Sequence, residues 1–404
     1  MRALVSGMVA GVSILLFAAG VVSAGDSRVP ERYELKLPNV PKTAYYYVMK
    51  PQGYDASKEY PLLIVIPGSH NPDGTVDDNR GYAGVCFWAY QGTEKFITIS
   101  LWYSNDIDAY PHWEKPNAIT GTDLMIRDAL ARFPVDKNRI FYQSFSAGGV
   151  LTKQMLDKYT RESPLKLAGI AFTDSNCRGG NQNVACIQND TAVFIGVGEF
   201  DKPPSEPFDC VAESNTWESI FKARCKDLEH HIIPGQKHNP GPEQMELFKK
   251  WIERVLKQID DREIAFAVQN LKNTQKALKK GDFGMALKLT EPSLKHDVKD
   301  NADFAEAKKI AAALRKHAEA LKKEYKDKIE KEPESGVAVL VAAGKVFKGS
   351  AVEEWAAKEL MNLKTQKQYQ SAISRASKNA KPIEDKEKAG IKEELGLTET
   401  KPVK

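Results

Sequence analysis

The stretch "RIFYQSFSAGG" (residues 139–149) runs from an apolar, strand-like segment into a turn of small residues. Its centre, Ser144-Phe145-Ser146-Ala147-Gly148, differs at one position from the G-x-S-x-G pattern, which places a nucleophilic serine on a sharp turn between a strand and a helix. The residues two before and two after that serine must be small; Gly148 is, and Ser144 adds one hydroxymethyl group. The pentapeptide leaves two interpretations open, a nucleophile at Ser146 or a Ser/Gly-rich turn without chemistry.

Short apolar runs on both sides of this stretch have the length of β-strands and alternate with segments of helical spacing. Several runs are continuous, which is typical of central strands covered on both faces. The alternation predicts a mostly parallel sheet in an α/β sandwich, with ligand sites at the carboxyl edge of the sheet. The predicted strands are 45–48, 62–66, 96–102, 140–143, 167–172, 192–197 and 230–233, and the predicted helices are 121–133, 150–159 and 245–256.

The texture of the chain changes after about residue 260, where strand patterns give way to helical ones at 262–280, 283–289, 302–329 and 352–363. The stretch "ALKKGDFGMALKL" (277–289) resembles the turn of a tetratricopeptide unit, and Gly349 follows Gly281 by 68 residues, twice a period of about 34. We therefore expect an all-α C-terminal appendage, for which a repeat is one interpretation. The expected organisation is a signal peptide (1–24), an α/β domain (25–258), a helical domain (259–381) and a disordered tail (382–404).

The net charge of +4 is unevenly distributed, because residues 1–260 carry −3 and residues 261–404 carry +7. The positive excess could bind an acidic polymer or a membrane surface, and the helical tail as a whole could bind a protein or a polymer. Mixed Lys and Glu on helices is more often a solvated face. The chain shows neither a glycine-rich phosphate loop nor the basic–aromatic clusters of nucleic-acid binding proteins. Its histidines show no metal-ligand spacing, so we expect no metal or other cofactor.

The N-terminus predicts export. Arg2 precedes an apolar run over residues 8–22, and the run ends in Val22-Ser23-Ala24, small residues of the kind that a signal peptidase reads. We expect cleavage after Ala24, a secreted or periplasmic protein, and no stable membrane span after cleavage; an uncleaved anchor is the alternative.

Export would allow the five cysteines to form disulfides. Neighbours in the sequence suggest the pairs Cys177–Cys186 and Cys210–Cys225, which leaves Cys86 outside both pairs.

Two further polar residues follow strands downstream of the serine. Asp201 ends "GEFD" (198–201) just after the sixth predicted strand, and His238 ends "PGQKH" (234–238) just after the seventh. A serine hydroxyl needs a base, a group that orients the base and donors for the developing oxyanion. The order Ser, Asp, His along the chain is the order of the α/β-hydrolase arrangement.

These motifs, with "VDKNRIFYQSFSAGG" (135–149), resemble the α/β-hydrolase superfamily and, within it, secreted polyhydroxyalkanoate depolymerase and feruloyl esterase-like serine esterases. The resemblance covers roughly residues 33 to 256. It implies that Ser146 is the nucleophile, His238 the general base and Asp201 the acid that orients the histidine. Glu199 and Asp174, which are also carboxylates near strand ends, are the rival acids.

The resemblance also implies an oxyanion loop after the third strand of the family's sheet, which typically carries His-Gly. Here the segment is "LLIVIPGSH" (62–70), in which Pro67 replaces the histidine and Gly68 is kept. The donors would be the backbone N–H groups of Ser69 and Ala147.

Aromatic residues gather in two loops that leave the predicted sheet, among them Trp88 in one and Trp102, Tyr103 and Trp113 in the other. They would suit carbohydrate-linked or aromatic esters, although packing of the loops onto the core explains each residue equally well. The sequence thus predicts a serine hydrolase that cleaves carboxylic esters. The alternatives are a serine peptidase of the same fold and an inactive hydrolase-like binding protein with a helical interaction tail.

Overall fold

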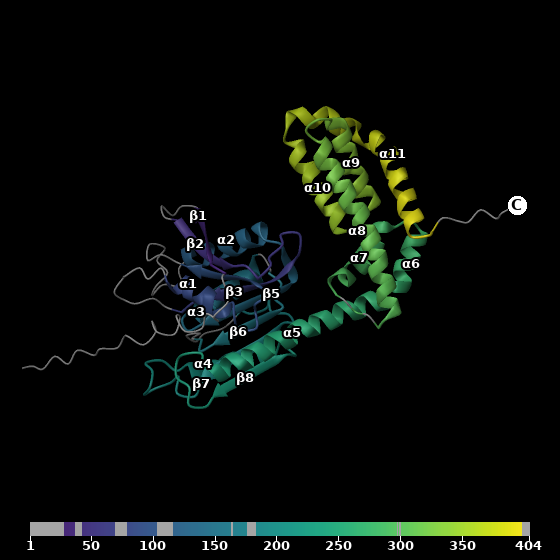
Figure 1. Ribbon diagram of the computed structural model, residues 1–404. Helices are drawn as coiled ribbons and strands as arrows, with labels where there is room; N and C mark the ends of the chain where they lie inside the picture. Colours follow the sequence, from purple (N-terminus) through teal and green to yellow (C-terminus); the bar gives the residue numbers. More distant parts are fainter. Residues whose placement is uncertain are drawn as a thin grey trace, which may run out of the picture. The chain divides into compact units, whose positions relative to one another are not determined.

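The described residues form two compact units. The computed structural model describes residues 28–36, 43–68, 79–102, 116–162, 165–175, 183–296, 298 and 300–397, and the units divide between Lys257 and Gln258 (Figure 1). The predicted signal peptide lies outside these residues. No helix in the described part of the chain is both long and apolar enough to cross a bilayer.

An eight-stranded sheet organises the first unit, in the order β1-β2-β4-β3-β5-β6-β7-β8. The pairs β1–β2 and β2–β4 are antiparallel and all others are parallel, so the predicted mostly parallel sheet is confirmed. The strands are β1 (Glu31–Lys36), β2 (Thr43–Met49), β3 (Tyr60–Ile66), β4 (Ile97–Trp102), β5 (Val135–Phe145), β6 (Gly169–Thr173), β7 (Ala192–Gly198) and β8 (Leu228–Ile233).

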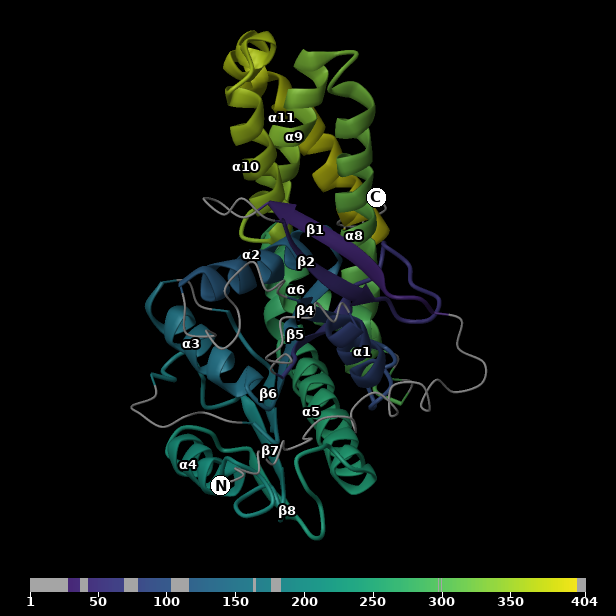
Figure 2. The same cartoon turned by 90° about the vertical axis from the view of Figure 1, so that its left-hand side faces the viewer.

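Helices cover both faces of this sheet, which explains why the central strands are apolar without alternation. Figure 2 shows α2 (Pro116–Arg132), α3 (Gly148–Arg161) and α4 (Cys210–Lys222) on one side, and α1 (Asn79–Trp88) and α5 (Pro242–Gln269) on the other. Successive side chains of β2 point to opposite faces of the sheet. Tyr46 and Val48 pack in the larger core, and Tyr45 and Tyr47 pack with α1. The sheet is therefore held rigid from both sides.

Helix α4 overturns the predicted Cys210–Cys225 disulfide. Cys210 begins this helix and Cys225 follows its end, and both are thiols. A helix of 13 residues spans roughly 20 Å, whereas the Cα atoms of a disulfide lie within about 7 Å. Cys186 is also a thiol and donates its S–H to the main-chain oxygen of Leu156 at 3.2 Å. Its predicted partner Cys177 lies outside the described residues.

The second unit is all-α, as predicted, with its own apolar core. Its helices are α6 (Leu271–Lys279), α7 (Phe283–Thr290), α8 (Ala302–Lys328), α9 (Pro333–Val346), α10 (Ala351–Lys364) and α11 (Gln370–Glu394), with short 3₁₀ turns at Glu291–Lys295 and Lys367–Tyr369. The apolar helix α9 packs against α8, α10 and α11. The repeat stays an interpretation.

The predicted disordered tail is wrong over much of its length. Helix α11 continues through Pro382 to Glu394, and Ile391 is fully buried. The inner face of α11 is built largely from alanines, such as Ala376 and Ala380, which bury little apolar area each and so give a weak pattern in the sequence. Residues 398–404 lie outside the described part of the chain.

Candidate active site

Ser146 stands at the turn between β5 and α3. Its φ of 52° lies in the left-handed region, which is unusual for a residue other than glycine. The turn is tight, since a methyl group at Gly148 would lie 2.6 Å from the main-chain oxygen of Ile66, and one at Gly68 would lie 3.0 Å from Cβ of Ser146. The backbone thus presents the Ser146 side chain at the carboxyl end of the central strand in a strained conformation, as a nucleophile elbow requires.

Ser144, the residue that departs from the glycine pattern, points away from the reacting face. It is fully buried, and its Oγ lies 3.0 Å from Oγ of Ser175 and 3.4 Å from the main-chain oxygen of Ala171. Its own main-chain oxygen accepts hydrogen bonds from the hydroxyls of Thr173 and Ser175. The hydroxymethyl group is therefore accommodated in a hydrogen-bonded polar network beneath the elbow.

The three residues predicted to act together lie in one hydrogen-bonded chain. Nε2 of His238 lies 2.8 Å from Oγ of Ser146, and Nδ1 of His238 lies 2.9 Å from both carboxylate oxygens of Asp201. Asp201 is fully buried and Ser146 is half-buried. With the Nδ1 proton directed at Asp201, Nε2 is the acceptor that faces the serine hydroxyl.

Two aromatic rings hold the imidazole, and sequence reasoning missed this role for both. The Phe145 ring stacks on His238 with centroids 5.4 Å apart, and the Phe208 ring meets it edge-on at 4.5 Å. Phe145 occupies the variable position before the candidate nucleophile, so the motif carries no signal for it. Packing from two sides restricts the imidazole to the plane that reaches Ser146 and Asp201.

The structure distinguishes among the three candidate acids. Glu199 accepts the Gly235 N–H at 2.9 Å, in the turn before the histidine loop. Asp174 accepts the Gly198 N–H at 2.9 Å. Asp201 is the carboxylate in contact with the imidazole.

The predicted oxyanion donors fall partly inside the described residues. Ala147 caps α3, so its N–H belongs to the first-turn amides that have no acceptor within the helix. Ser69 lies outside the described residues, but Gly68 before it contacts the elbow. The role of Ser69 and Ala147 stays a prediction.

Of the four predicted substrate-binding aromatics, Trp88 is the one whose side chain lies within the described residues. Trp88 is 3% exposed and packs edge-on against Phe248 of α5, so it belongs to the core, which is the packing alternative stated above. Trp102 ends β4, and its side chain lies outside the described part, as do Tyr103 and Trp113.

A second Ser–His–carboxylate chain lies between α4 and β8 and could not be read from the sequence order. Nε2 of His230 lies 3.0 Å from Oγ of Ser214, and Nδ1 lies 3.1 Å from Glu218. Ser214 is 3% exposed, sits inside a helix and donates to the main-chain oxygen of Val211. Ser214 therefore lies neither on a nucleophile elbow nor at a position that a substrate could reach, and its hydrogen bond to His230 is a buried structural contact. It offers a matched control for Ser146.

Other side-chain clusters are less suited to chemistry. His296 lies between two carboxylates, with Nε2 3.0 Å from Glu263 and Nδ1 3.9 Å from Asp260. The His296 ring thus hydrogen-bonds to Glu263 through Nε2 and faces Asp260 with Nδ1.

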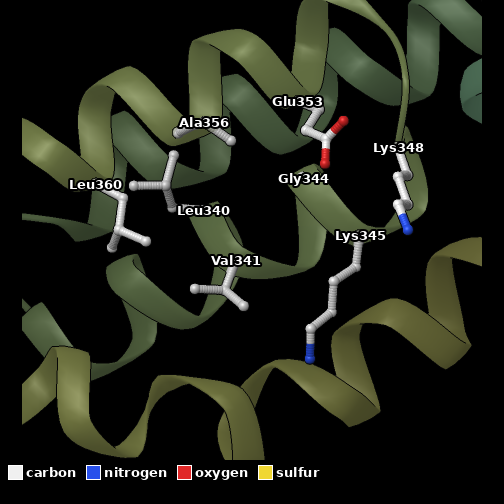
Figure 3. Close-up of a pocket in the computed structure, with 9 residues that line it drawn as sticks. Leu340, Val341, Gly344, Lys345, Lys348, Glu353, Ala356 and Leu360 are labelled. Atoms are coloured by element: carbon white, nitrogen blue, oxygen red, sulfur yellow. The ribbon is translucent and has the colours of Figure 1, made fainter.

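A cavity of about 310 Å³ lies between α9 and α10 in the helical unit. Leucine, valine and alanine side chains line one end of it, and Glu353, Lys345 and Lys348 lie at the other (Figure 3).

The strand order, the elbow and the order Ser146, Asp201, His238 define an α/β-hydrolase fold. A comparison with protein-family models finds no matching model, and one with curated proteins finds no similar sequence. Among solved structures, the ferulic acid esterase of Anaeromyces mucronatus is similar at 14% identity and a TM-score of 0.39, over 57% of this chain and 92% of that one. The S-formylglutathione hydrolase of Staphylococcus aureus is similar at 12% identity and a TM-score of 0.38, over 57% and 99%. At these values the likeness carries no argument about function.

Proposed function

We propose that the protein is a serine hydrolase that cleaves carboxylic esters through an acyl-enzyme intermediate. The observation that carries this proposal is the continuous chain from Ser146 through His238 to a fully buried Asp201, with Ser146 at a positive φ. A left-handed serine is a strained conformation that the surrounding packing must maintain, and such strain clusters at functional sites.

The geometry supports the following steps. Oγ of Ser146 attacks the ester carbonyl carbon while Nε2 of His238 takes the hydroxyl proton, and backbone N–H groups such as that of Ala147 stabilise the oxyanion. The tetrahedral intermediate collapses, the C–O bond to the alcohol breaks, and His238 returns the proton to the departing oxygen. Water then repeats the sequence on the acyl-enzyme, with Asp201 stabilising the imidazolium each time.

Carbohydrate-linked or aromatic esters are the proposed substrates, on the strength of Trp102, Tyr103 and Trp113 in the sequence. Export is proposed from the N-terminal segment and predicts a mature protein that begins at Gly25. N-terminal sequencing of protein recovered from outside the cytoplasm tests the cleavage site.

The function is tested by labelling the purified protein with a fluorophosphonate probe and assaying p-nitrophenyl esters, feruloyl esters and matched amides. Ser146→Ala should abolish labelling and lower turnover by about 10⁴- to 10⁶-fold. Ser214→Ala is the matched control, because it removes the other histidine-bonded serine and should leave both readouts intact.

A folded wild-type protein that neither labels nor turns over any ester would refute the proposal. Amide cleavage at rates comparable to the esters would instead assign a peptidase.

A further inference from the structure

Asp174 is a buried carboxylate that the steps above do not use. It follows β6 directly, between the strand that carries Ser146 and the strand that leads to Asp201. It is fully buried, and its φ of 43° makes it, with Ser146, one of two non-glycine residues with positive φ in the described part of the chain. Backbone strain at a buried polar residue requires support from its surroundings.

That support links Asp174 to the loop that carries the catalytic acid. Oδ1 of Asp174 accepts the Gly198 N–H at 2.9 Å, and the Gly198 main-chain oxygen accepts the Asp201 N–H at 3.0 Å. The main-chain N–H of Asp174 donates to Gly196 at 2.8 Å, so the residue also extends the pairing of β6 with β7. One side chain thereby fixes the end of β7 three residues before Asp201.

Asp174 also contacts the far side of the same site. Its main-chain oxygen accepts the S–H of Cys210 at 3.6 Å, and that sulfur lies 3.9 Å from Nδ1 of His238. The Cys210 N–H donates to the main-chain oxygen of Asp201 at 3.0 Å. Asp174 therefore belongs to the shell around the Asp201–His238 pair.

The second carboxylate oxygen points to a role beyond structure. Oδ2 of Asp174 is buried and makes no hydrogen bond of ordinary length among the described residues, although the Gln244 side chain of α5 is near enough to lower the pKa of this carboxyl group. Burial raises the pKa of Asp174 to about 7, and the charge of Asp201 also raises this pKa. The Gly198 N–H, His238 and Gln244 of α5 lower it. The thiol of Cys210 on α4 stays protonated, because burial and the nearby carboxylates raise its pKa. Asp174 thus changes charge near neutral pH beside a catalytic pair.

We propose that Asp174 is a positioning residue of the triad, which fixes the Asp201 loop through Gly198 and adds, when ionised, a second negative charge that stabilises the imidazolium of His238. This inference rests on the proposed function. It predicts that the enzyme gains activity as Asp174 loses its proton, over and above any change due to the triad itself.

The test compares kcat/KM of the wild type and Asp174→Asn from pH 5.5 to 8.5. Asparagine tolerates the left-handed backbone and keeps an oxygen for the Gly198 N–H. The ratio of wild-type to variant kcat/KM should therefore stay near one at pH 5.5 and rise to about ten at pH 8.5, where only the wild type carries the extra charge.

Two further variants complete the test. Asp174→Ala also removes the acceptor and should lose activity at every pH, with rescue by asparagine at pH 5.5. Asp209→Asn removes a carboxylate charge from the N-cap of α4, at a position more accessible than that of Asp174. The ratio of wild-type to Asp209→Asn kcat/KM should not change with pH.

An active wild type with a constant wild-type to Asp174→Asn ratio across this range would overturn the inference. A wild type that is folded and inactive throughout would instead overturn the proposed function, so the two failures are distinct.

Discussion

Replacement of Gly198 by alanine should separate Asp201 from His238 without unfolding the sheet. Gly198 is the last residue of β7, and a methyl group there would lie 2.5 Å from the main-chain oxygens of both Gln236 and Lys237, which directly precede His238. Real Cβ atoms essentially never approach closer than 3.0 Å. The two segments must therefore move apart by at least about 0.5 Å.

This displacement is large on the scale of the site. The contact between Nδ1 of His238 and Asp201 is 2.9 Å, and an added 0.5 Å takes it beyond the range of about 2.7–3.2 Å for N–H···O hydrogen bonds. A misplacement of about 1 Å can cost a factor of about 100 in rate. We expect Gly198→Ala to lower kcat/KM by roughly 10- to 100-fold and to destabilise the fold by about 1–3 kcal/mol.

The assay is steady-state hydrolysis of a p-nitrophenyl ester, with thermal unfolding followed in parallel. Gly235→Ala is the matched control in the segment that a methyl group at Gly198 would displace, since a methyl group at Gly235 meets nothing within 4 Å although φ is +69°. It should lower stability by about 1 kcal/mol through backbone strain and leave kcat/KM unchanged.

Wild-type kcat/KM for a folded Gly198→Ala protein would refute this reasoning. So would an equal loss of activity in Gly235→Ala, because backbone strain in the turn, rather than displacement of the histidine loop, would then explain the loss.

Three other perturbations follow from the same contacts. Asp201→Asn should lower kcat by about 10⁴-fold at neutral pH while the protein stays folded, because the amide favours the wrong imidazole tautomer, and a loss below 10-fold would contradict its role. Trp217→Ala should cost about 3–5 kcal/mol in denaturant unfolding, since the indole is fully buried and stacks on Phe172 and Phe221; a cost under 1 kcal/mol would contradict that packing. For Asp174 the folded pKa is raised from 3.8 to about 7, so the folded protein holds this proton longer than the unfolded chain and stability falls as pH rises from about 4 to 7. The stability of Asp174→Asn relative to wild type should accordingly rise by up to about 4 kcal/mol over this range, and a flat difference in urea unfolding would contradict the shift.

The sequence by itself determined the layers and the order of the site. Continuous apolar runs at 62–66, 140–143 and 192–197 can only be buried on both faces, which predicts parallel central strands with helices on either side. Residues that follow such strands meet at one edge, so Ser146, Asp201 and His238 could be grouped before any distance was known. These predictions depend on local periodicity and on the chirality of chain connections. Both can be inferred from short stretches of sequence.

Features that depend on spacing in three dimensions could not be read in this way. The predicted Cys210–Cys225 disulfide is wrong because these two neighbours in sequence are held at opposite ends of α4. The helix through Pro382 was missed because small alanines pack against α9 and give little apolar signal of their own.

The roles of polar groups around the triad were decided by tertiary structure alone. Ser144 is tolerated because its side-chain hydroxyl meets Oγ of Ser175 and the main-chain oxygen of Ala171, which lie on and just after the neighbouring strand. Asp174 is linked to Asp201 only because β6 and β7 pair in parallel, so that its carboxylate reaches the Gly198 amide. Motifs specify which residue types can react, whereas burial and hydrogen bonding between distant segments decide that Asp201 contacts the histidine and that Asp174 contacts the Gly198 amide.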